Sequence, residues 1–207
     1  MDNVIGQSHD SEKDDIYLKN VAKLGSSSEN IYIVNDVLPQ EEYTKIVNFT
    51  ENSDLNLWIS EPWGTQILNN ESISKEIKEI LNNIFQIAKT KSTNYYNIEF
   101  SSGLNDTSKF NLIKWGKGCS MKPHIDTYHQ KGNHIVVMYY INDNYDGGEI
   151  VFPDYNVKIK PKSNSLIMFP GNENYLHEVL EVTGGLRYTF PTQLQFAGST
   201  FFGRVRY

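Results

Sequence analysis

The chain has very little cysteine: Cys119 is the only one in 207 residues. A single thiol cannot form an internal disulfide, so nothing indicates an oxidising compartment. No apolar run approaches the roughly 20 residues that a membrane-spanning helix needs. The first thirty residues are polar and acidic, without the basic start and apolar core of a secretory signal. We therefore expect a cytoplasmic protein with no membrane partner.

Positive charge is also scarce. The 19 Lys and Arg residues are outnumbered by 25 Asp and Glu, which gives a net charge of −6. Proteins that bind nucleic acid usually carry a basic face. Lys158, Lys160 and Lys162 alternate as they would on one side of a strand, and we interpret them as a solvated strand face. The charge argues against a nucleic-acid partner, and no feature of the sequence indicates an oligomeric state.

The length allows one domain with a small appendage. Residues 1–28 are polar, include a Gly-Ser-Ser-Ser tract and are typical of a flexible leader. We expect residues 29–207 to form a single domain. A short strand at 31–34 is followed by helical patterns at 38–52 and 70–90, the second with an apolar stripe of isoleucines and leucine.

From residue 94 the pattern changes to short strands separated by turn signals, beginning with "YYNIEF" (95–100). Many short strands predict an antiparallel sandwich or barrel. Helices that precede strands favour the α+β class, with the helices packed on one sheet.

Metal-binding residue types occur at two places in this strand-rich part. If "HID" lies in a strand, the side chains of His124 and Asp126 project from the same face. His177, the only histidine in the C-terminal third, opens the later segment "HEVLEV". Two histidines and one carboxylate suit non-haem Fe(II), because the open coordination positions can take a chelating cosubstrate and O₂. A structural zinc site would need four ligands, usually with thiolates, which Cys119 alone does not provide.

Arginine is the rare basic residue, since only three of the 19 are arginines. Arg187 lies ten residues after His177, and a hairpin would bring its side chain beside the strand of His177. A guanidinium binds a carboxylate through two parallel hydrogen bonds, which an ammonium group cannot match. Arg187 therefore suits the far carboxylate of a diacid bound to the metal, and Thr189 on the same face could add a hydroxyl.

Other residues of these types have alternative interpretations. His124, His129 and His134 could form a rival metal site, but this leaves His177 and Arg187 without a role. We interpret His129 and His134 as loop or strand surface residues. Two tryptophans, Trp58 and Trp63, fall in a segment without helical pattern. Core packing is the simpler interpretation for them, and a lid over a substrate is the alternative.

Four spaced motifs resemble those of the prolyl 4-hydroxylase-like branch of the Fe(II)/2-oxoglutarate-dependent dioxygenase superfamily. They are "WGKGCSMKPHID", "YYINDNYDGGEIVFP", "PKSNSLIMF" and "HEVLEVTGGLRY", and the resemblance covers about residues 94–197. It implies a double-stranded β-helix (jelly-roll) core and a catalytic core over this range. It also implies that His124, Asp126 and His177 bind the iron and that Arg187 binds 2-oxoglutarate.

The resemblance further implies that Tyr140 hydrogen-bonds the far carboxylate of 2-oxoglutarate. Trp115 stands where many relatives have tyrosine, and its indole N–H could contact the cosubstrate. Collagen-type relatives often have lysine at the position of Arg187. The turn of "PKSNS" has Asn164 in place of the usual glycine, and asparagine tolerates a left-handed backbone almost as well.

The sequence therefore predicts an Fe(II)- and 2-oxoglutarate-dependent dioxygenase that uses O₂ and releases succinate and CO₂, with ascorbate keeping the iron reduced. Its expected substrate is a protein or peptide, through a peptidyl proline or another side chain. The alternatives are an oxygenase of the same fold acting on a free amino acid, a small molecule or a nucleobase, and a non-catalytic, metal-stabilised binding module. The nucleobase branch places a second arginine six residues after the first, where this chain has Gln193.

Overall fold

The computed structural model describes residues 27–62, 64–68, 70–100, 111–126 and 134–197. Two α-helices lie in the N-terminal half, α2 (Gln40–Asn52) and α3 (Lys75–Tyr96). Short 3-10 helices are η1 (Ser28–Asn30), η2 (Leu55–Leu57), η3 (Asn70–Ser72) and η5 (Pro153–Tyr155). No helix in the described part of the chain is long and apolar enough to cross a membrane.

The largest sheet has seven antiparallel strands, and its order does not follow the sequence. In spatial order they are β1 (Tyr32–Val34), β10 (Ser165–Pro170), β6 (His134–Tyr140), β13 (Arg187–Gln195), β4 (Leu112–Trp115), β3 (Gln66–Leu68) and β2 (Trp58–Ser60). The central strand pair β6 and β13 runs in continuous register from Thr189 opposite Tyr140 to Gln195 opposite His134. This register decides which side chains of the two strands share a face.

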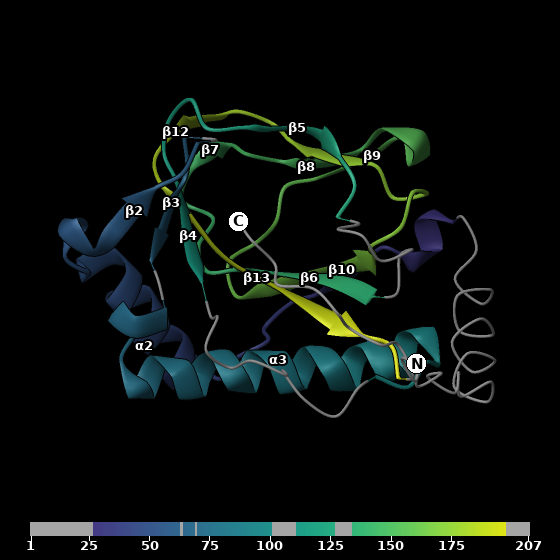
Figure 1. Ribbon diagram of the computed structural model, residues 1–207, viewed down its shortest axis with the longest axis horizontal. Helices are drawn as coiled ribbons and strands as arrows, with labels where there is room; N and C mark the ends of the chain where they lie inside the picture. Colours follow the sequence, from purple (N-terminus) through teal and green to yellow (C-terminus); the bar gives the residue numbers. More distant parts are fainter. Residues whose placement is uncertain (1–26, 63, 69, 101–110, 127–133, 198–207) are drawn as a thin grey trace, which may run out of the picture.

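A smaller sheet faces the large one. It contains β5 (Met121–His124), β11 (His177–Val179), β8 (Ile150–Phe152) and β9 (Val157–Ile159), in that order. A two-stranded ladder of β7 (Asp146–Gly147) and β12 (Val182–Gly184) lies beside it. Figure 1 shows the two larger sheets as separate layers, with α3 running along the outer side of the large sheet. This is the double-stranded β-helix fold with helices on one sheet, as the sequence predicted.

Helix α3 begins where the sequence supplies a cap. The hydroxyl of Ser74 accepts a hydrogen bond from the backbone N–H of Ile77, which satisfies one of the free donors of the first turn. The buried stripe continues from Ala88 beyond the predicted end at residue 90, through Ser92 to Tyr96. Asn97 ends the helix in the left-handed conformation, φ 51°.

The prediction of a strand at 95–100 is therefore wrong. Tyr95 and Tyr96 form the last turn of α3, and only Phe100 makes an isolated bridge, to Phe196. Aromatic residues favour strands in isolation. Here packing decides, because Tyr96 is buried and its hydroxyl donates to the carbonyl of Asn30.

Two apolar cores flank the large sheet, because side chains along a strand alternate between its faces. On the helix side, Ile135, Val137 and Tyr139 of β6 pack with the stripe of α3. On the other side, Val136 and Tyr140 pack between the two sheets. The segment that the sequence analysis left without structure contributes β2 and β3, and Trp58 is buried in the helix-side core. Trp63 lies outside the described residues.

Candidate metal centre and cosubstrate site

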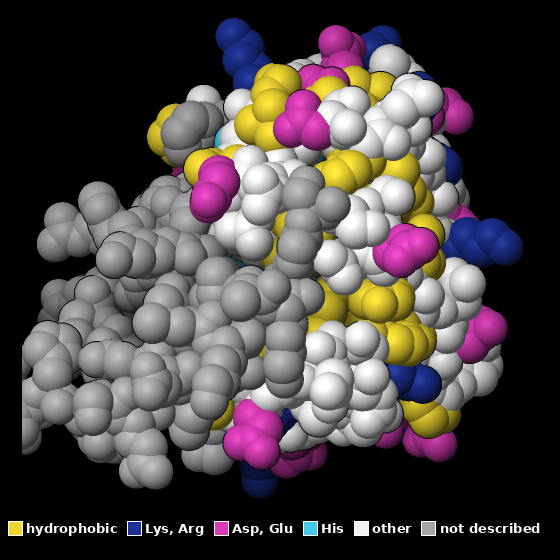
Figure 2. Space-filling view, turned by 90° about the vertical axis from the view of Figure 1, so that its right-hand side faces the viewer, with side chains coloured by type: hydrophobic (Ala, Val, Ile, Leu, Met, Phe, Trp, Pro, Cys, Tyr) yellow, Lys and Arg dark blue, Asp and Glu magenta, His cyan; other side chains and the backbone are white. Residues whose placement is uncertain are grey.

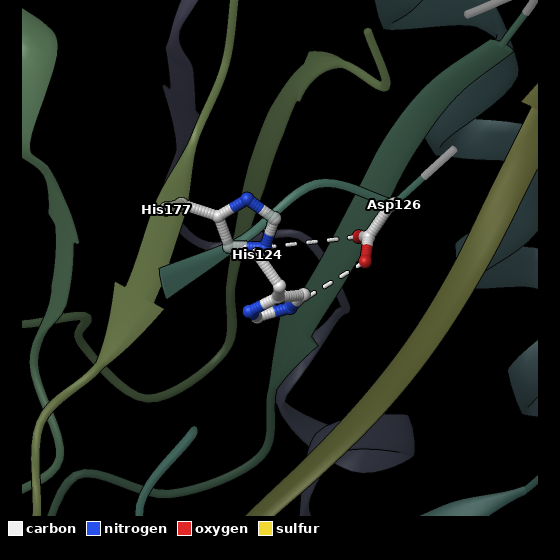
Figure 3. A group of neighbouring side chains, drawn as sticks. All are labelled: His124, Asp126 and His177. Carbon is white, nitrogen blue, oxygen red and sulfur yellow. Dashed lines mark ion pairs between the residues drawn. The ribbon is translucent and has the colours of Figure 1, made fainter. Parts of the chain in front are cut away.

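His124, Asp126 and His177 lie together on the inner side of the small sheet. Their potential ligand atoms all lie within 4.8 Å of one another. His124 and His177 are cross-strand partners of β5 and β11, so their rings project from the same face. Strand β5 ends at His124, and Asp126 follows it with a carboxylate turned toward both imidazoles (Figure 3). Its two oxygens lie 3.5 Å from His124 Nε2 and 3.8 Å from His177 Nε2.

Backbone carbonyls orient both imidazoles. His124 Nδ1 lies 2.8 Å from the carbonyl oxygen of Lys122, and His177 Nδ1 lies 3.1 Å from that of Tyr175. A carbonyl only accepts, so each Nδ1 carries the proton and donates it. Each Nε2 is then left with a lone pair directed toward Asp126, which is the arrangement found in histidines that bind metals.

His177 is held in its neutral, metal-binding form by its surroundings. Burial lowers the pKa of His177, against the opposing effect of the nearby Asp126 carboxylate. The rings of Phe169 and Phe152 have their centroids 4.7 Å and 5.8 Å from that of His177. These rings form an apolar wall behind the ligand, which restricts the access of water to the group.

The donor set fits a divalent iron. It offers two neutral nitrogens and one carboxylate, and no fourth histidine, cysteine, aspartate or glutamate joins this group within the described ranges. A three-ligand group leaves coordination positions for a chelating cosubstrate and a gas molecule. Of the rival group of three histidines, His129 lies outside the described residues.

Arg187 approaches from the facing sheet. The hairpin expected from the sequence does not exist, because β12 follows β11 and Arg187 begins β13 of the large sheet. The arginine is fully buried. Its guanidinium carbon lies 4.5 Å from the centre of the Trp115 ring, and its Nη2 donates a 3.4 Å hydrogen bond to the hydroxyl of Tyr140.

Among the described residues, the guanidinium has no anionic partner. Its Nε and Nη1 are buried, and neither has a hydrogen-bond partner in the structure; none of the ion pairs among the described residues includes Arg187. A buried cation without a counter-charge is costly. The arrangement is therefore suited to an anionic group that enters the space between the sheets.

Trp115 and Thr189 complete this side of the site. The indole N–H of Trp115 donates to the hydroxyl oxygen of Thr189 at 3.1 Å, and both residues are buried. The indole proton is therefore used within the protein, and the Thr189 hydroxyl keeps its own proton for another acceptor. Burial raises the pKa of Tyr140, against the effect of Arg187, so its hydroxyl also remains protonated near neutral pH.

Tyr145 lies in the loop between β6 and β7 and was not among the site residues predicted from the sequence. It is buried, and its hydroxyl lies close to Arg187 without a well-formed hydrogen bond to any described residue. Burial raises its pKa to about 12, and nearby Arg187 opposes that rise. The absence of a side chain at Gly148 allows Tyr145 and Arg187 to pack closely against this residue. A Cβ at residue 148 would lie 3.1 Å from the Tyr145 ring and 3.3 Å from Arg187 Cδ.

Lys160 holds this loop in place. Its ammonium group donates to the carbonyl oxygens of Tyr145, at 2.9 Å, and of Gly147, and lies 3.7 Å from the centre of the Tyr145 ring. Loop residues have no strand parity, so periodicity could not have revealed Tyr145. The unexplained aromatic residue before "DGG" was the only available signal.

His134 is buried, so its prediction as a surface residue is wrong. It begins β6, is 3% exposed, and its Nε2 is buried without a partner. Burial lowers the pKa of His134, while the charge and backbone of nearby Asp126 oppose the shift. Gln195, its cross-strand partner, also has a buried side-chain oxygen without a partner. Strand parity could have placed both residues on the inner face.

Comparison with known proteins agrees with this geometry. The sequence pattern of the 2OG-Fe(II) oxygenase superfamily matches residues 109–192. A search of curated proteins found no match. The predicted resemblance to the Fe(II)/2-oxoglutarate-dependent oxygenase superfamily is confirmed over these residues.

Several solved structures share the fold. A prolyl hydroxylase from Trichoplax adhaerens, in complex with a hypoxia-inducible factor peptide, has 18% identity and a TM-score of 0.63, covering 92% of this chain and 94% of its own. The viral collagen prolyl hydroxylase of Paramecium bursaria Chlorella virus-1, in complex with 2OG, has 16% identity and a TM-score of 0.62, covering 83% and 98%. A Pseudomonas putida prolyl-4-hydroxylase has 16% identity and a TM-score of 0.62, covering 86% and 96%. At these identities the likeness establishes the fold.

Proposed function

We propose that this chain, which carries the 2OG-Fe(II) oxygenase pattern over residues 109–192, is an Fe(II)- and 2-oxoglutarate-dependent dioxygenase that hydroxylates a C–H bond. The observation that carries the proposal is that two unlike groups, one on each of the facing sheets, occur in the same fold. One is a cluster of two histidines and an aspartate. The other is a buried arginine with unpartnered donors.

Each group has a separate part in the proposal. His124, Asp126 and His177 would hold Fe(II), and Arg187 would bind the far carboxylate of 2-oxoglutarate. With O₂, the bound iron and 2-oxoglutarate supply the oxidising chemistry, which yields succinate and CO₂ together with the hydroxylated product.

The protein's own residues position the cosubstrate and exclude water. Tyr140, already bonded to Arg187, and Thr189 would each donate a hydroxyl proton to the same carboxylate. Trp115 shapes the pocket by stacking on the guanidinium and orients Thr189, rather than donating to the cosubstrate. Dipoles and charges fixed in a dry site bind an anion more strongly than the same groups in water.

The proposed substrate is a protein or peptide, hydroxylated on a peptidyl proline or another side chain. The support is the shared fold with prolyl hydroxylases, one of which is in complex with a peptide. We also propose that ascorbate keeps the iron reduced. A nucleobase substrate is disfavoured because Gln193 occupies the position of the second arginine and the net charge is −6. On the described part of the face in Figure 2, acidic and basic side chains are scattered rather than gathered in a basic field.

Succinate formation from 2-oxoglutarate, with Fe(II) and no other substrate, tests the proposal. We expect turnover in the wild type and none in His177→Ala or Asp126→Ala, because each loses a metal ligand. Asp154→Ala is the matched control, since Asp154 is exposed on η5. Iron occupancy is measured in parallel. An iron-loaded wild type that forms no succinate would favour the non-catalytic binding module.

A further inference from the structure

Two buried polar atoms have no role in the proposed metal and cosubstrate sites. Five buried side-chain nitrogen or oxygen atoms of the described residues have no hydrogen-bond partner. Three belong to Arg187 and Tyr145, at the proposed carboxylate site. The others are Nε2 of His134 and Oε1 of Gln195, which oppose each other directly on β6 and β13. Buried polar atoms are nearly always hydrogen-bonded, so such a pair needs an explanation.

The pair faces the space between the two sheets. Its neighbours Ile135 and Leu194 pack in the core beneath α3, and alternation along the strands turns His134 and Gln195 to the opposite face. This is the face from which Val136 packs between the sheets. Asp126 opposes the lowering of the His134 pKa by burial, which places the histidine beside the metal-binding group.

The pair lies at the opposite end of the strands from the arginine. His134 is six residues from Tyr140, the partner of Arg187. Six residues of strand span about 20 Å. His177 packs on Phe169, which is the cross-strand partner of Val136. The proposed metal-binding group is therefore nearer to His134 than to Arg187. If 2-oxoglutarate occupies the Arg187 side, the space beside His134 remains for the substrate that is hydroxylated.

The backbone of Gly171 holds the imidazole of His134 in place. A Cβ at residue 171 would lie 2.1 Å from His134 Nε2, and the N–H of Gly171 donates to the carbonyl of His134 at 2.9 Å. Pro191 and Gln193, on the same face of β13 as Gln195, are only half-buried. Gln195 itself is also only half-buried, so this end of the face is partly exposed.

We propose that the carboxamide oxygen of Gln195, beside the His134 imidazole that Gly171 covers, is a binding subsite for a backbone N–H of the peptide substrate, next to the residue that is hydroxylated. This inference rests on the proposed function. The carboxamide oxygen of Gln195 can only accept a hydrogen bond, so its partner must be a donor. An unsatisfied buried acceptor is unfavourable, and that cost is recovered when a donor binds. A secondary amide supplies that donor, whereas the amide nitrogen of a proline has no hydrogen.

The test uses a degenerate peptide library and mass spectrometry to find peptides that gain one oxygen atom in the presence of Fe(II) and 2-oxoglutarate. The best peptide is then remade with an N-methyl group at each backbone nitrogen in turn. We expect N-methylation at one position near the hydroxylated residue to lower kcat/KM by about tenfold in the wild type, the loss expected for one hydrogen bond.

Gln195→Met removes the acceptor while keeping similar bulk. We expect it to lower kcat/KM for the unmodified peptide by about tenfold and to abolish the sensitivity to that one N-methyl group. Gln66→Met is the matched control and should behave as the wild type. Gln66 pairs with Lys114, whose ammonium group lies over Trp58 on the helix side of the same sheet.

Each outcome is decisive. Equal N-methyl sensitivity in Gln195→Met and wild type would overturn the subsite, as would a wild type insensitive at every position. A wild type that forms succinate but oxidises no library peptide would refute the proposal that the subsite binds a peptide. Binding of Mn(II) and N-oxalylglycine is measured separately, and a wild type that neither binds them nor forms succinate would refute the proposed function itself.

Discussion

At the scale of single residues, the proposed cosubstrate site depends on a cation placed away from water. Arg187 is fully buried between Trp115 and Tyr140, with two unpartnered donor atoms. A guanidinium in this position is held by stacking before any ligand arrives. Such preorganisation lowers the entropy lost on binding, so small changes in this pocket should appear directly in the affinity for the diacid.

The first prediction concerns Arg187→Lys. An ammonium group cannot make two parallel hydrogen bonds to a carboxylate and does not stack on Trp115 as a planar group does. We expect the dissociation constant of N-oxalylglycine, measured by calorimetry with Mn(II), to rise about tenfold. Lys158→Arg on the exposed face of β9 should leave it unchanged. Equal affinity in Arg187→Lys and wild type would show that Arg187 does not bind the far carboxylate.

The second prediction concerns Tyr145→Phe. The Tyr145 hydroxyl is protonated, buried and close to Arg187, so we expect it to donate to the same carboxylate. Its removal should weaken N-oxalylglycine binding by about fivefold, consistent with one hydrogen bond. Tyr95→Phe is the control, because Tyr95 stacks on Tyr32 at the end of α3. A loss of the same size in both variants would exclude a local role for Tyr145.

At the scale of elements, one turn joins the N-terminal segment to the barrel. Asn164 precedes β10 in the left-handed conformation, φ 52°. Its carboxamide accepts hydrogen bonds from the backbone N–H of Leu38 and the hydroxyl of Tyr139, and donates to the carbonyl of Leu38, each at 2.9 Å. Asparagine therefore does more here than tolerate a left-handed backbone. It connects the start of α2 to the large sheet.

The third prediction follows from this connection. Asn164→Gly keeps the backbone conformation but removes three buried hydrogen bonds, so we expect about 2–4 kcal/mol of lost stability in urea unfolding. Asn156→Gly is a close control, because Asn156 also has φ 52° but is exposed. Comparable losses in the two variants would attribute the effect to glycine in the unfolded chain rather than to the hydrogen bonds.

Some of the helices and strands could be predicted from the sequence, and others could not. Alternation and helical periodicity predicted the helices and the antiparallel strands, since these depend on local burial patterns, whereas the jelly roll was implied by the resemblance of the four motifs. The end of α3 was misplaced because Tyr96 is fixed by tertiary packing. The hairpin drawn from His177 to Arg187 was wrong because ten residues span a further strand. The roles assigned to the predicted ligands stay predictions, although the structure brings His124, Asp126 and His177 together.

Long-range register accounts for the residues that were missed. Strand β6 pairs with β13 across more than 45 positions of sequence, and a single sequence does not specify this register. His134 and Gln195 meet only through that pairing. Tyr145 reaches Arg187 from a loop without periodicity. Both depend on contacts between distant segments, which composition and spacing do not encode.

At the scale of the whole molecule, the two proposed ligand-binding groups lie on different sheets. His124 and His177 belong to the small sheet, whereas Arg187 belongs to the large one. A metal-bound diacid would therefore connect the layers of the fold. Binding should stabilise the molecule against global unfolding and not only order a loop.

The fourth prediction is a thermal shift. Mn(II) with N-oxalylglycine, each at about 100 times its dissociation constant, should raise the melting temperature by about 5–10 °C. EDTA should reverse the shift, because the analogue is held through the metal. In Arg187→Lys, the same concentrations should give a smaller shift. An analogue that stabilises the protein equally with and without metal would contradict a site shared by the two sheets.

The most direct measurement is a crystal structure with Mn(II) and N-oxalylglycine bound. The account predicts one metal ion coordinated by His124, Asp126 and His177. It further predicts that the analogue chelates this ion at one end and pairs with Arg187 at the other. A metal bound elsewhere, or an analogue whose far carboxylate points away from Arg187, would contradict the central claim.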